Sequence, residues 1–351
     1  MAPASDAPRI LVIRRRYIGD LVLITPLLAN LKLHWPLAEI TVLVDEGYED
    51  ILRLNANADH LLTIPRKGPR RLQRNFALLR ALRRQRFTHV FDLDTNDRTA
   101  FLTRITGAAF RASYTSDKHR WRRSLAYNHV RHVPLAEYNS DSILENYLRL
   151  LPLAGVPVVR HDCQLEPTRE NVRQAEAAFA PSALGRRVLL HPGSRSAYRI
   201  WPLERFARVA DRLHTEAGAQ VFLTGGPSET KLIEGICSAA QTPLTVLPTP
   251  ANVGLFAAYA RIADVFLCHD SGPMHIAAAV GTRVVALFSA QSTTLWSPAG
   301  SGHQVLQAAM PCAAACVAPT QCDPNNGYKS YCVRRITEDQ VFSAVRAALN
   351  R

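Results

Sequence analysis

The stretch that decides the fold is His269-Asp270-Ser271-Gly272-Pro273-Met274-His275. A short apolar run at residues 263–268 precedes it, and small apolar residues at 276–280 and a strand-like run at 283–288 follow it. Strand, polar turn, helix and strand is the order of a parallel α/β unit. The sequence therefore predicts this turn at the carboxyl end of a strand and the amino end of a helix.

Such a turn suits an anion, because unpaired backbone N–H groups and the helix dipole favour negative charge there. A phosphate or pyrophosphate is the expected ligand. Ser271 adds a hydroxyl donor, Gly272 lets the backbone approach the ligand, and Asp270 can orient the turn. His275, one turn into the helix, points back toward the same place. Ordinary capping uses the same residue types, so the stretch alone fits a structural turn equally well.

Two more strand-like runs end in turns of this kind. Residues 187–191 lead into a turn that contains Gly193, Ser194 and Arg199, and residues 219–224 lead into Gly225-Gly226 and Glu229. Three such turns at one crevice would form a nucleotide site at the carboxyl edge of a parallel sheet. Their repetition argues against coincidental capping.

Length and charge indicate a two-domain protein with a basic first half. A chain of 351 residues exceeds one compact core and fits two α/β domains. No apolar run reaches the roughly 18 residues of a membrane span, and residues 1–9 lack the apolar core of a signal peptide, which favours a cytoplasmic protein. Residues 1–165 carry 25 Lys and Arg against 16 Asp and Glu, and the remainder 17 against 13. The first half is therefore expected to meet a polyanion: nucleic acid, an anionic membrane or a phosphorylated substrate.

The first predicted βα loop contains a candidate base. A buried-strand pattern at residues 10–13 runs into Arg14-Arg15-Arg16-Tyr17-Ile18-Gly19-Asp20, and an apolar helix follows, interrupted by Thr25-Pro26. Asp20 is either a helix N-cap or a general base aimed into a cleft. The two roles conflict, because a helix N-terminus stabilises the carboxylate and weakens it as a base.

Residues 70–86 predict an amphipathic helix with a cationic outer face. Leu72, Phe76, Leu79 and Leu82 recur at helical spacing among many arginines. The cationic face is either solvated or a docking surface for phosphates or anionic lipid. A second basic patch, with an aromatic residue inside it, lies at residues 118–123.

Two possible metal motifs remain open. Asp92-Leu93-Asp94 ends a strand pattern and is interpreted as acidic loop residues in preference to a metal-binding Asp-x-Asp motif. Four of the seven cysteines, Cys312, Cys316, Cys322 and Cys332, cluster in a segment rich in Pro, Asn and Gly. They are a candidate structural zinc site, with free thiols or disulfides as the alternatives.

Three segments resemble glycosyltransferase family 9, the ADP-heptose:lipopolysaccharide heptosyltransferases: residues 14–20 with Leu27-Leu28, residues 191–201 and residues 270–275. The resemblance covers nearly the whole chain, and residues 17–20 and 198–201 look most similar to the heptosyltransferase III branch. It implies the GT-B fold, an α/β architecture of two Rossmann-like domains that face each other across a cleft. Residues 1–158 would bind the acceptor and residues 159–335, with the Cys-rich segment 312–332, the nucleotide-sugar. Residues 336–351 would form a terminal helix that packs back on the first domain.

The resemblance also implies roles for single residues. Asp20 matches the general base that takes the proton from the acceptor hydroxyl as it attacks and inverts the anomeric carbon. Arg199 stands where the family often has a lysine that neutralises the diphosphate, and its guanidinium offers a different geometry. Glu229 lies near the family's ribose-binding acidic residue. The expected donor-binding residues are Gly193, Ser194, Arg199, Glu229, Asp270, Ser271, Gly272 and His275, and the expected acceptor-binding residues are Gly19, Arg66, Lys67 and Arg120.

The expected function is inverting transfer of heptose from ADP-heptose to the inner core of lipopolysaccharide. No metal or other cofactor is expected, because a cationic side chain and helix N-termini can carry the charge of the leaving diphosphate. The basic patches would hold a phosphorylated, lipid-linked oligosaccharide, which makes the protein peripheral at the inner face of the inner membrane. The alternatives are a related GT-B transferase with another donor or glycan acceptor, a nucleotide-sugar epimerase, and a basic nucleic-acid-binding protein.

Overall fold

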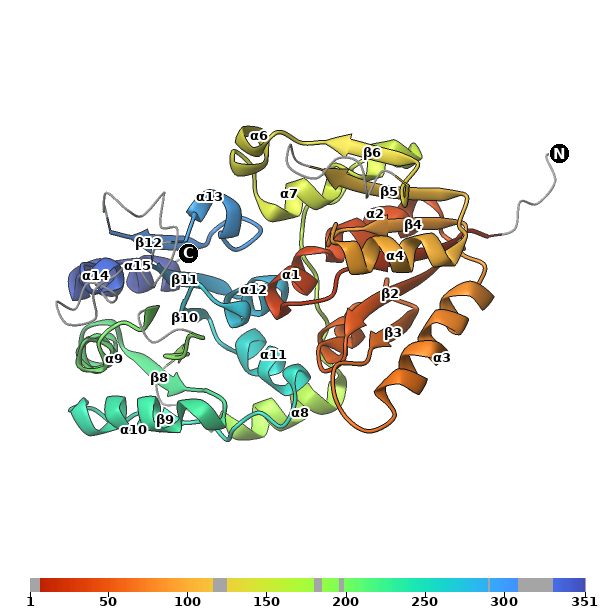
Figure 1. The fold of residues 1–351 in the computed structure, drawn as a ribbon. Coiled ribbons are helices and arrows are strands. Elements are labelled where there is room, and N and C mark those ends of the chain that lie inside the picture. Colours follow the sequence, from red (N-terminus) through yellow and green to blue (C-terminus); the bar gives the residue numbers. More distant parts are fainter. Residues whose placement is uncertain are drawn as a thin grey trace. The chain divides into compact units, whose positions relative to one another are not determined.

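The chain forms two compact units, Met1–Gln164 and Leu165–Arg351 (Figure 1). The computed structural model describes residues 7–115, 125–179, 185–195, 199–289, 291–308 and 331–350. Each unit is built on a six-stranded sheet whose neighbouring strands all pair in parallel. The two sheets have the same topology, which is that of a Rossmann-like unit.

The first sheet has the strand order β3-β2-β1-β4-β5-β6. Its strands are β1 (Arg9–Ile13), β2 (Glu39–Asp45), β3 (His60–Ile64), β4 (His89–Asp92), β5 (Phe110–Thr115) and β6 (His129–His132). Its helices are α1 (Ile18–Leu23), α2 (Thr25–His34), α3 (Arg71–Arg84), α4 (Asp97–Thr106), α6 (Leu135–Asn139) and α7 (Ile143–Leu148), with 3₁₀ turns η1 (Glu49–Leu54) and η2 (Leu151–Ala154). Thr25-Pro26 begins a second helix, since Pro26 occupies the first turn of α2, where its missing N–H needs no partner.

The second sheet has the strand order β12-β11-β10-β7-β8-β9. Its strands are β7 (Arg186–Leu190), β8 (Ala219–Leu223), β9 (Thr245–Val246), β10 (Val265–His269), β11 (Arg283–Phe288) and β12 (Gln304–Gln307). Its helices are α8 (Arg169–Ala178), α9 (Leu203–Ala217), α10 (Thr230–Ala239), α11 (Val253–Ile262), α12 (Gly272–Ala279), α13 (Thr293–Trp296), α14 (Tyr331–Arg334) and α15 (Glu338–Leu349), with the 3₁₀ turn η4 (Pro227–Glu229). The central strands β10 and β11 are apolar except for His269 at the end of β10 and Arg283 at the start of β11, because helices cover both faces.

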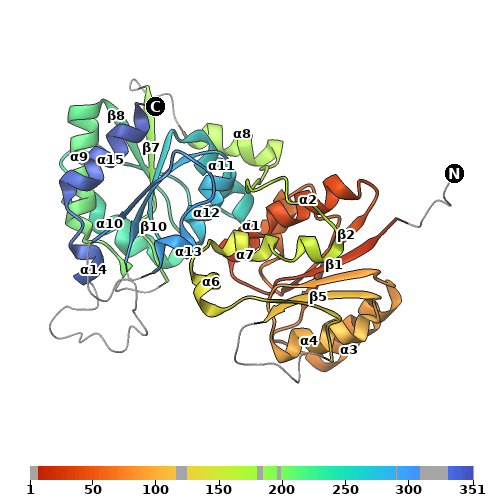
Figure 2. The same cartoon turned by 90° about the horizontal axis from the view of Figure 1, so that it is seen from above.

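Helices lie on both faces of each sheet, as Figure 2 shows: α9, α10 and α15 cover one face of the second sheet, and α8, α11 and α12 the other. Thr337 caps α15, and its hydroxyl accepts the backbone N–H of Gln340. Val341, Phe342 and Val345 belong to the core beneath α9. Helix α15 thus packs on the sheet of its own unit, and its expected packing on the first domain stays a prediction.

Helix α3 forms as predicted, but some of its apolar residues are buried against the sheet and others are exposed to solvent. Leu78 and Leu82 are buried against β1, β3 and β4. Leu72 and Phe76, which the spacing grouped with the buried face, are 70% and 71% exposed. The reason is helical geometry: Leu78 and Leu82 point to one side, whereas Leu72 and Phe76 lie about 100° or more away around the axis.

None of the helices in the described part of the chain is both long enough and apolar enough to cross a bilayer.

Candidate active site

Polar residues gather in each unit where the strand order reverses. In the first sheet the reversal lies between β1 and β4, and in the second between β7 and β10. In open parallel sheets, ligands bind outside the carboxyl ends of the strands at this switch point. Asp20 follows β1 and Asp270 follows β10, so the two most informative predicted residues each lie beside a switch point.

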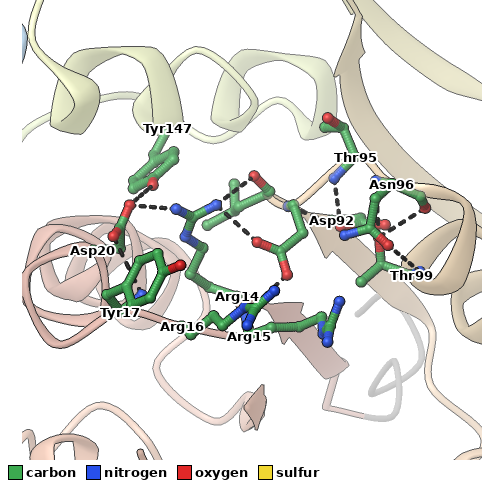
Figure 3. Close-up of polar contacts among 12 residues, drawn as sticks. Arg14, Arg15, Arg16, Tyr17, Asp20, Asp92, Thr95, Asn96, Thr99 and Tyr147 are labelled. Atoms are coloured by element: carbon green, nitrogen blue, oxygen red, sulfur yellow. Dashed lines mark hydrogen bonds and ion pairs between the residues drawn. The ribbon is translucent and has the colours of Figure 1, made fainter. Parts of the chain in front are cut away.

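Asp20 is buried, with 4% of its surface exposed, and three donors hold its carboxylate (Figure 3). The Tyr147 hydroxyl donates to Oδ1 at 3.0 Å, and the Arg14 guanidinium forms an ion pair with the same oxygen. The Tyr17 backbone N–H donates to Oδ2 at 3.2 Å. Asp20 is therefore the third residue of α1 and not its N-cap, which is Tyr17. These donors fix the direction of the carboxylate.

Arg14 also joins the two loops at the first switch point. Its guanidinium donates to Asp94 Oδ1 at 2.8 Å and to the Leu93 carbonyl at 3.3 Å. The Arg15 backbone N–H donates to the other Asp94 oxygen at 3.0 Å. Burial raises the pKa of Asp94, and Arg14 opposes that effect. Arg14 thus bridges Asp20 and Asp94, a role that the local sequence pattern does not indicate.

Asp92 is fully buried and organises the loop after β4. Its Oδ1 accepts the backbone N–H groups of Asp94 and Thr95 at 3.0 and 3.1 Å, and the Tyr127 hydroxyl donates to Oδ2 at 2.6 Å. Burial raises its pKa to about 6. Both carboxylates of the Asp-x-Asp motif are thus engaged in loop contacts. Across the described ranges, no group of three or more His, Cys, Asp or Glu side chains could hold a metal ion.

The expected acceptor residues have different surroundings. Gly19 is buried in the first turn of α1. Arg66 and Lys67 are exposed after β3, and the Arg66 backbone N–H donates to Glu46 at 3.2 Å. Arg120 and the patch at residues 118–123 lie outside the described residues, as do Cys312, Cys316, Cys322 and the side chain of Cys332. The zinc hypothesis therefore stays a prediction.

The three turns of the second unit lie side by side. Strand β7 pairs with β10 on one side and with β8 on the other, and Leu190 is in register with Leu267 and Leu223. The turns after these strands consequently share one edge of the sheet, as the sequence analysis predicted. Buried polar atoms without a hydrogen-bond partner among the described residues occur at the ends of β7, β8, β10 and β11: His191 Nδ1, Thr224 Oγ1, both Asp270 carboxyl oxygens and Ser289 Oγ. Buried polar groups normally have partners, so their grouping indicates a polar ligand here.

Glu229 connects the turns after β7 and β8. Its Oε2 accepts the Gly226 backbone N–H at 2.6 Å and lies 3.3 Å from His191 Nε2. Burial alone would raise the pKa of Glu229, but His191 and the Gly226 N–H lower it below its usual range. A Cβ atom on Gly193 would lie 1.4 Å from Glu229 Oε1. Glycine at position 193 therefore leaves room for the Glu229 carboxylate.

Asp270 is the buried acid of the second switch point. It is 7% exposed, and its Oδ2 lies 3.6 Å from the Arg199 guanidinium. Burial raises the pKa of Asp270 to about 7, and Arg199 opposes the rise. Ser271 is the N-cap of α12, and its hydroxyl donates to the His269 carbonyl at 3.3 Å. Gly272 begins the helix and His275 is buried in it, so the predicted anion turn has the expected place at a helix N-terminus.

Residues 75–325 match the model of glycosyltransferase family 9 (heptosyltransferase). The chain belongs to this family. It is 29% identical over 295 residues to lipopolysaccharide heptosyltransferase 3 of Escherichia coli, an alignment that covers 81% of this chain and 84% of that protein. This heptosyltransferase-family member is therefore a glycosyltransferase, and the epimerase and nucleic-acid-binding alternatives are set aside.

Solved structures of the family share its fold. A glycosyl transferase family 9 protein from Veillonella parvula matches with a TM-score of 0.82 and 23% identity, over 100% of this chain and 99% of that one. E. coli heptosyltransferase WaaC with ADP-2-deoxy-2-fluoro heptose matches with a TM-score of 0.72 and 18% identity, over 97% and 99%. The two Rossmann-like units are thus those of the GT-B fold expected from the sequence.

His269 has a structural role that the sequence pattern does not indicate. It is fully buried, and its Nε2 accepts the Trp201 backbone N–H at 2.9 Å. Burial lowers its pKa to about 3, so the ring is a neutral acceptor. The Trp201 indole donates in turn to the Ile336 carbonyl at 3.0 Å. These contacts tie the segment that follows Arg199 to the end of β10, 68 positions away.

Gly193→Ala is expected to lower the free energy of unfolding by about 1–3 kcal/mol, the usual range for overpacking. The added methyl group must displace the Glu229 carboxylate from its contact with His191. Urea denaturation measures the loss, and Gly185→Ala is the matched control, since a Cβ there meets no atom of the described residues within 4 Å. In a Glu229→Ala background the cost should shrink. An equal cost in both backgrounds would show that Glu229 is not the obstacle.

Asp270 is expected to make stability depend on pH. Its folded-state pKa of about 7 lies above the ordinary 3.8, so its contribution to the free energy of unfolding is complete below about pH 4 and lost as the pH rises through 7. The loss amounts to at most about 4 kcal/mol at 1.36 kcal/mol per pH unit. As the pH rises from acidic to alkaline, wild type should therefore lose free energy of unfolding that Asp270→Asn does not lose. Urea denaturation across this range measures it, with the exposed Asp339→Asn as control; parallel curves for wild type and Asp270→Asn would refute the assignment.

Proposed function

We propose that this glycosyltransferase moves heptose, with inversion, from ADP-heptose to the inner core of lipopolysaccharide. The assignment of the donor site rests mainly on the buried polar atoms at the carboxyl ends of the strands beside the second switch point, with Arg199 next to Asp270. The relative named lipopolysaccharide heptosyltransferase 3 and the solved WaaC structure with an ADP-heptose analogue support this donor and acceptor. In this proposal residues 1–158, which lie in the first unit, bind the acceptor, and residues 159–335 bind the nucleotide-sugar.

Asp20 is the general base of the proposed reaction. The acceptor hydroxyl oxygen forms a bond to the anomeric carbon of heptose, while the bond from that carbon to the β-phosphate oxygen breaks. The electron pair leaves with ADP, and the hydroxyl proton passes to the Asp20 carboxylate. Arg14 and Tyr147 orient that carboxylate, because both donate hydrogen bonds to it. Attack from the face opposite ADP inverts the anomeric centre.

The donor site neutralises the leaving diphosphate with protein groups alone. The N-terminus of α12 offers backbone N–H groups at Ser271 and Gly272, and Gly193 and Ser194 offer further phosphate contacts. Arg199 supplies the positive charge for ADP, which makes a metal ion unnecessary for the chemistry. His275 lies on the same helix, close to the diphosphate in this proposal. Glu229, in the turn after β8, is assigned to the ribose hydroxyls.

The acceptor is a phosphorylated oligosaccharide on a lipid anchor. Arg66 and Lys67 are exposed beyond β3, at the same edge of the first sheet as Asp20, and are suited to its phosphates. Arg120 and Gly19 complete the proposed acceptor set. Such an acceptor lies in the inner membrane, so the enzyme works as a peripheral protein at its cytoplasmic face.

Calorimetric titration with ADP, UDP, GDP and CMP tests the donor assignment. Preferential binding of ADP is expected, and below about pH 7, where the Asp270 carboxyl is largely protonated and can donate to a phosphate, the binding should weaken in Asp270→Ala. Preference for UDP or CMP would keep the glycosyltransferase but reject ADP-heptose as its donor. A control titration with Asp211→Ala, which removes an acidic side chain from a different part of the second unit, should match wild type.

A further inference from the structure

Two large apolar side chains are exposed together at the start of α3. Leu72 and Phe76 are 70% and 71% exposed and four positions apart, so they lie next to each other on one face of the helix. A single exposed apolar residue is ordinary on a protein surface. A neighbouring leucine and phenylalanine on a helix that is otherwise rich in arginine is a more specific arrangement.

Two exposed arginines lie on the same face of α3, towards its C-terminal end. Arg80 and Arg83 follow Phe76 at four and seven positions, and both are exposed. We call Leu72, Phe76, Arg80 and Arg83 the α3 stripe. Leu78 and Leu82 fasten the opposite side of the helix to the sheet, so the stripe faces away from the core of its unit. Residues 66–86 include nine Lys and Arg and no Asp or Glu.

We propose that the α3 stripe is a docking surface for an anionic lipid bilayer. Leu72 and Phe76 enter the boundary between headgroups and acyl chains, and the arginines pair with anionic headgroups. An anionic bilayer fits both kinds of residue in the stripe, because it has negatively charged headgroups for the arginines and an apolar layer beneath them for Leu72 and Phe76. The inference rests on exposure and charge in α3. It extends the proposed function by giving the enzyme a way to reach a lipid-anchored acceptor.

Sedimentation with lipid vesicles tests the proposal. Wild-type protein should bind vesicles of phosphatidylethanolamine and phosphatidylglycerol and should bind phosphatidylcholine vesicles far more weakly. Leu72→Ser/Phe76→Ser should lower binding to the anionic vesicles by about 100-fold, which corresponds to about tenfold for each apolar side chain. Arg80→Gln/Arg83→Gln should lower it by about tenfold or more and reduce its sensitivity to salt. Leu37→Ser is the matched control, since Leu37 is 81% exposed outside α3 and should be neutral.

Enzyme activity provides a second readout. Leu72→Ser/Phe76→Ser should transfer normally to a lipid-free core oligosaccharide and more slowly to acceptor embedded in vesicles. Its thermal unfolding should match wild type, because both side chains are exposed. Vesicle binding needs no transferase activity, so a failure of the proposed donor or acceptor leaves it measurable.

Three results would overturn the docking proposal. The first is wild-type protein that fails to bind anionic vesicles. The second is equal vesicle binding by wild type and Leu72→Ser/Phe76→Ser, which would exclude apolar insertion. The third is self-association that this double substitution abolishes, which would assign the stripe to a second copy of the chain.

Discussion

Asp20→Ala is expected to lower kcat for heptose transfer by about 10²- to 10⁴-fold, the range for loss of a general base. The acceptor hydroxyl would then lose the carboxylate that takes its proton. ADP binding should be unchanged, because the proposed donor residues belong to the second unit. Single-turnover measurements with saturating donor, combined with calorimetry for ADP, separate these two effects.

Two variants separate base catalysis from damage to the fold around Asp20. Asp20→Asn keeps the shape of the side chain but cannot accept the proton, so it should lose nearly as much kcat as alanine. Tyr147→Phe removes one donor at 3.0 Å and leaves the base in place, so its loss should be smaller. Asp50→Ala removes an exposed carboxylate of the same unit and should match wild type. Wild-type kcat in both Asp20 variants would mean that another group is the base.

Arg199→Ala is expected to weaken ADP binding by about 10- to 100-fold, which corresponds to the 1.5–3 kcal/mol of a charge-assisted hydrogen bond. The substitution also leaves Asp270 without its nearby cation, and an ionised Asp270 would repel the diphosphate. Arg199 lowers the pKa of Asp270, so without Arg199 that pKa should lie above 7, and the loss should grow at alkaline pH, where Asp270 ionises in the variant. Calorimetry at several pH values measures both effects.

Arg199→Lys is the matching conservative variant. Lysine keeps the charge but lacks the planar fork, so this variant should retain much of the ADP affinity that alanine loses. Arg173→Ala, on the exposed surface of α8, controls for the loss of one positive charge and should bind ADP normally. Equal affinity in wild type and Arg199→Ala would remove Arg199 from the donor site.

The fold was accessible from the sequence because its signals are local. Apolar runs such as residues 10–13 and 265–268 each precede a polar turn, and that order alone predicts parallel α/β units. The predicted neighbourhood of the three turns in the second unit is confirmed, since β10, β7 and β8 are adjacent. The place of α15 was not accessible, because an amphipathic helix shows which face it buries but not which surface it covers.

The surroundings of the site were less accessible because they depend on contacts between distant residues. Tyr147 contacts Asp20, 127 positions away in the sequence, and Arg14 contacts Asp94, 80 positions away. The local sequence pattern predicts neither contact. His269 stands beside a residue that was singled out, yet its contact with Trp201 depends on how two strand ends meet. The exposure of Leu72 and Phe76 follows from which side of α3 meets the sheet, and helical spacing alone does not settle that.

The most direct test of the central claim is mass spectrometry and NMR of the product formed from ADP-heptose and a lipopolysaccharide inner-core acceptor. Wild-type enzyme should add one heptose with inverted anomeric configuration and release ADP, and Asp20→Asn should form almost no product. No transfer from ADP-heptose, or transfer with retained configuration, would refute the proposed function.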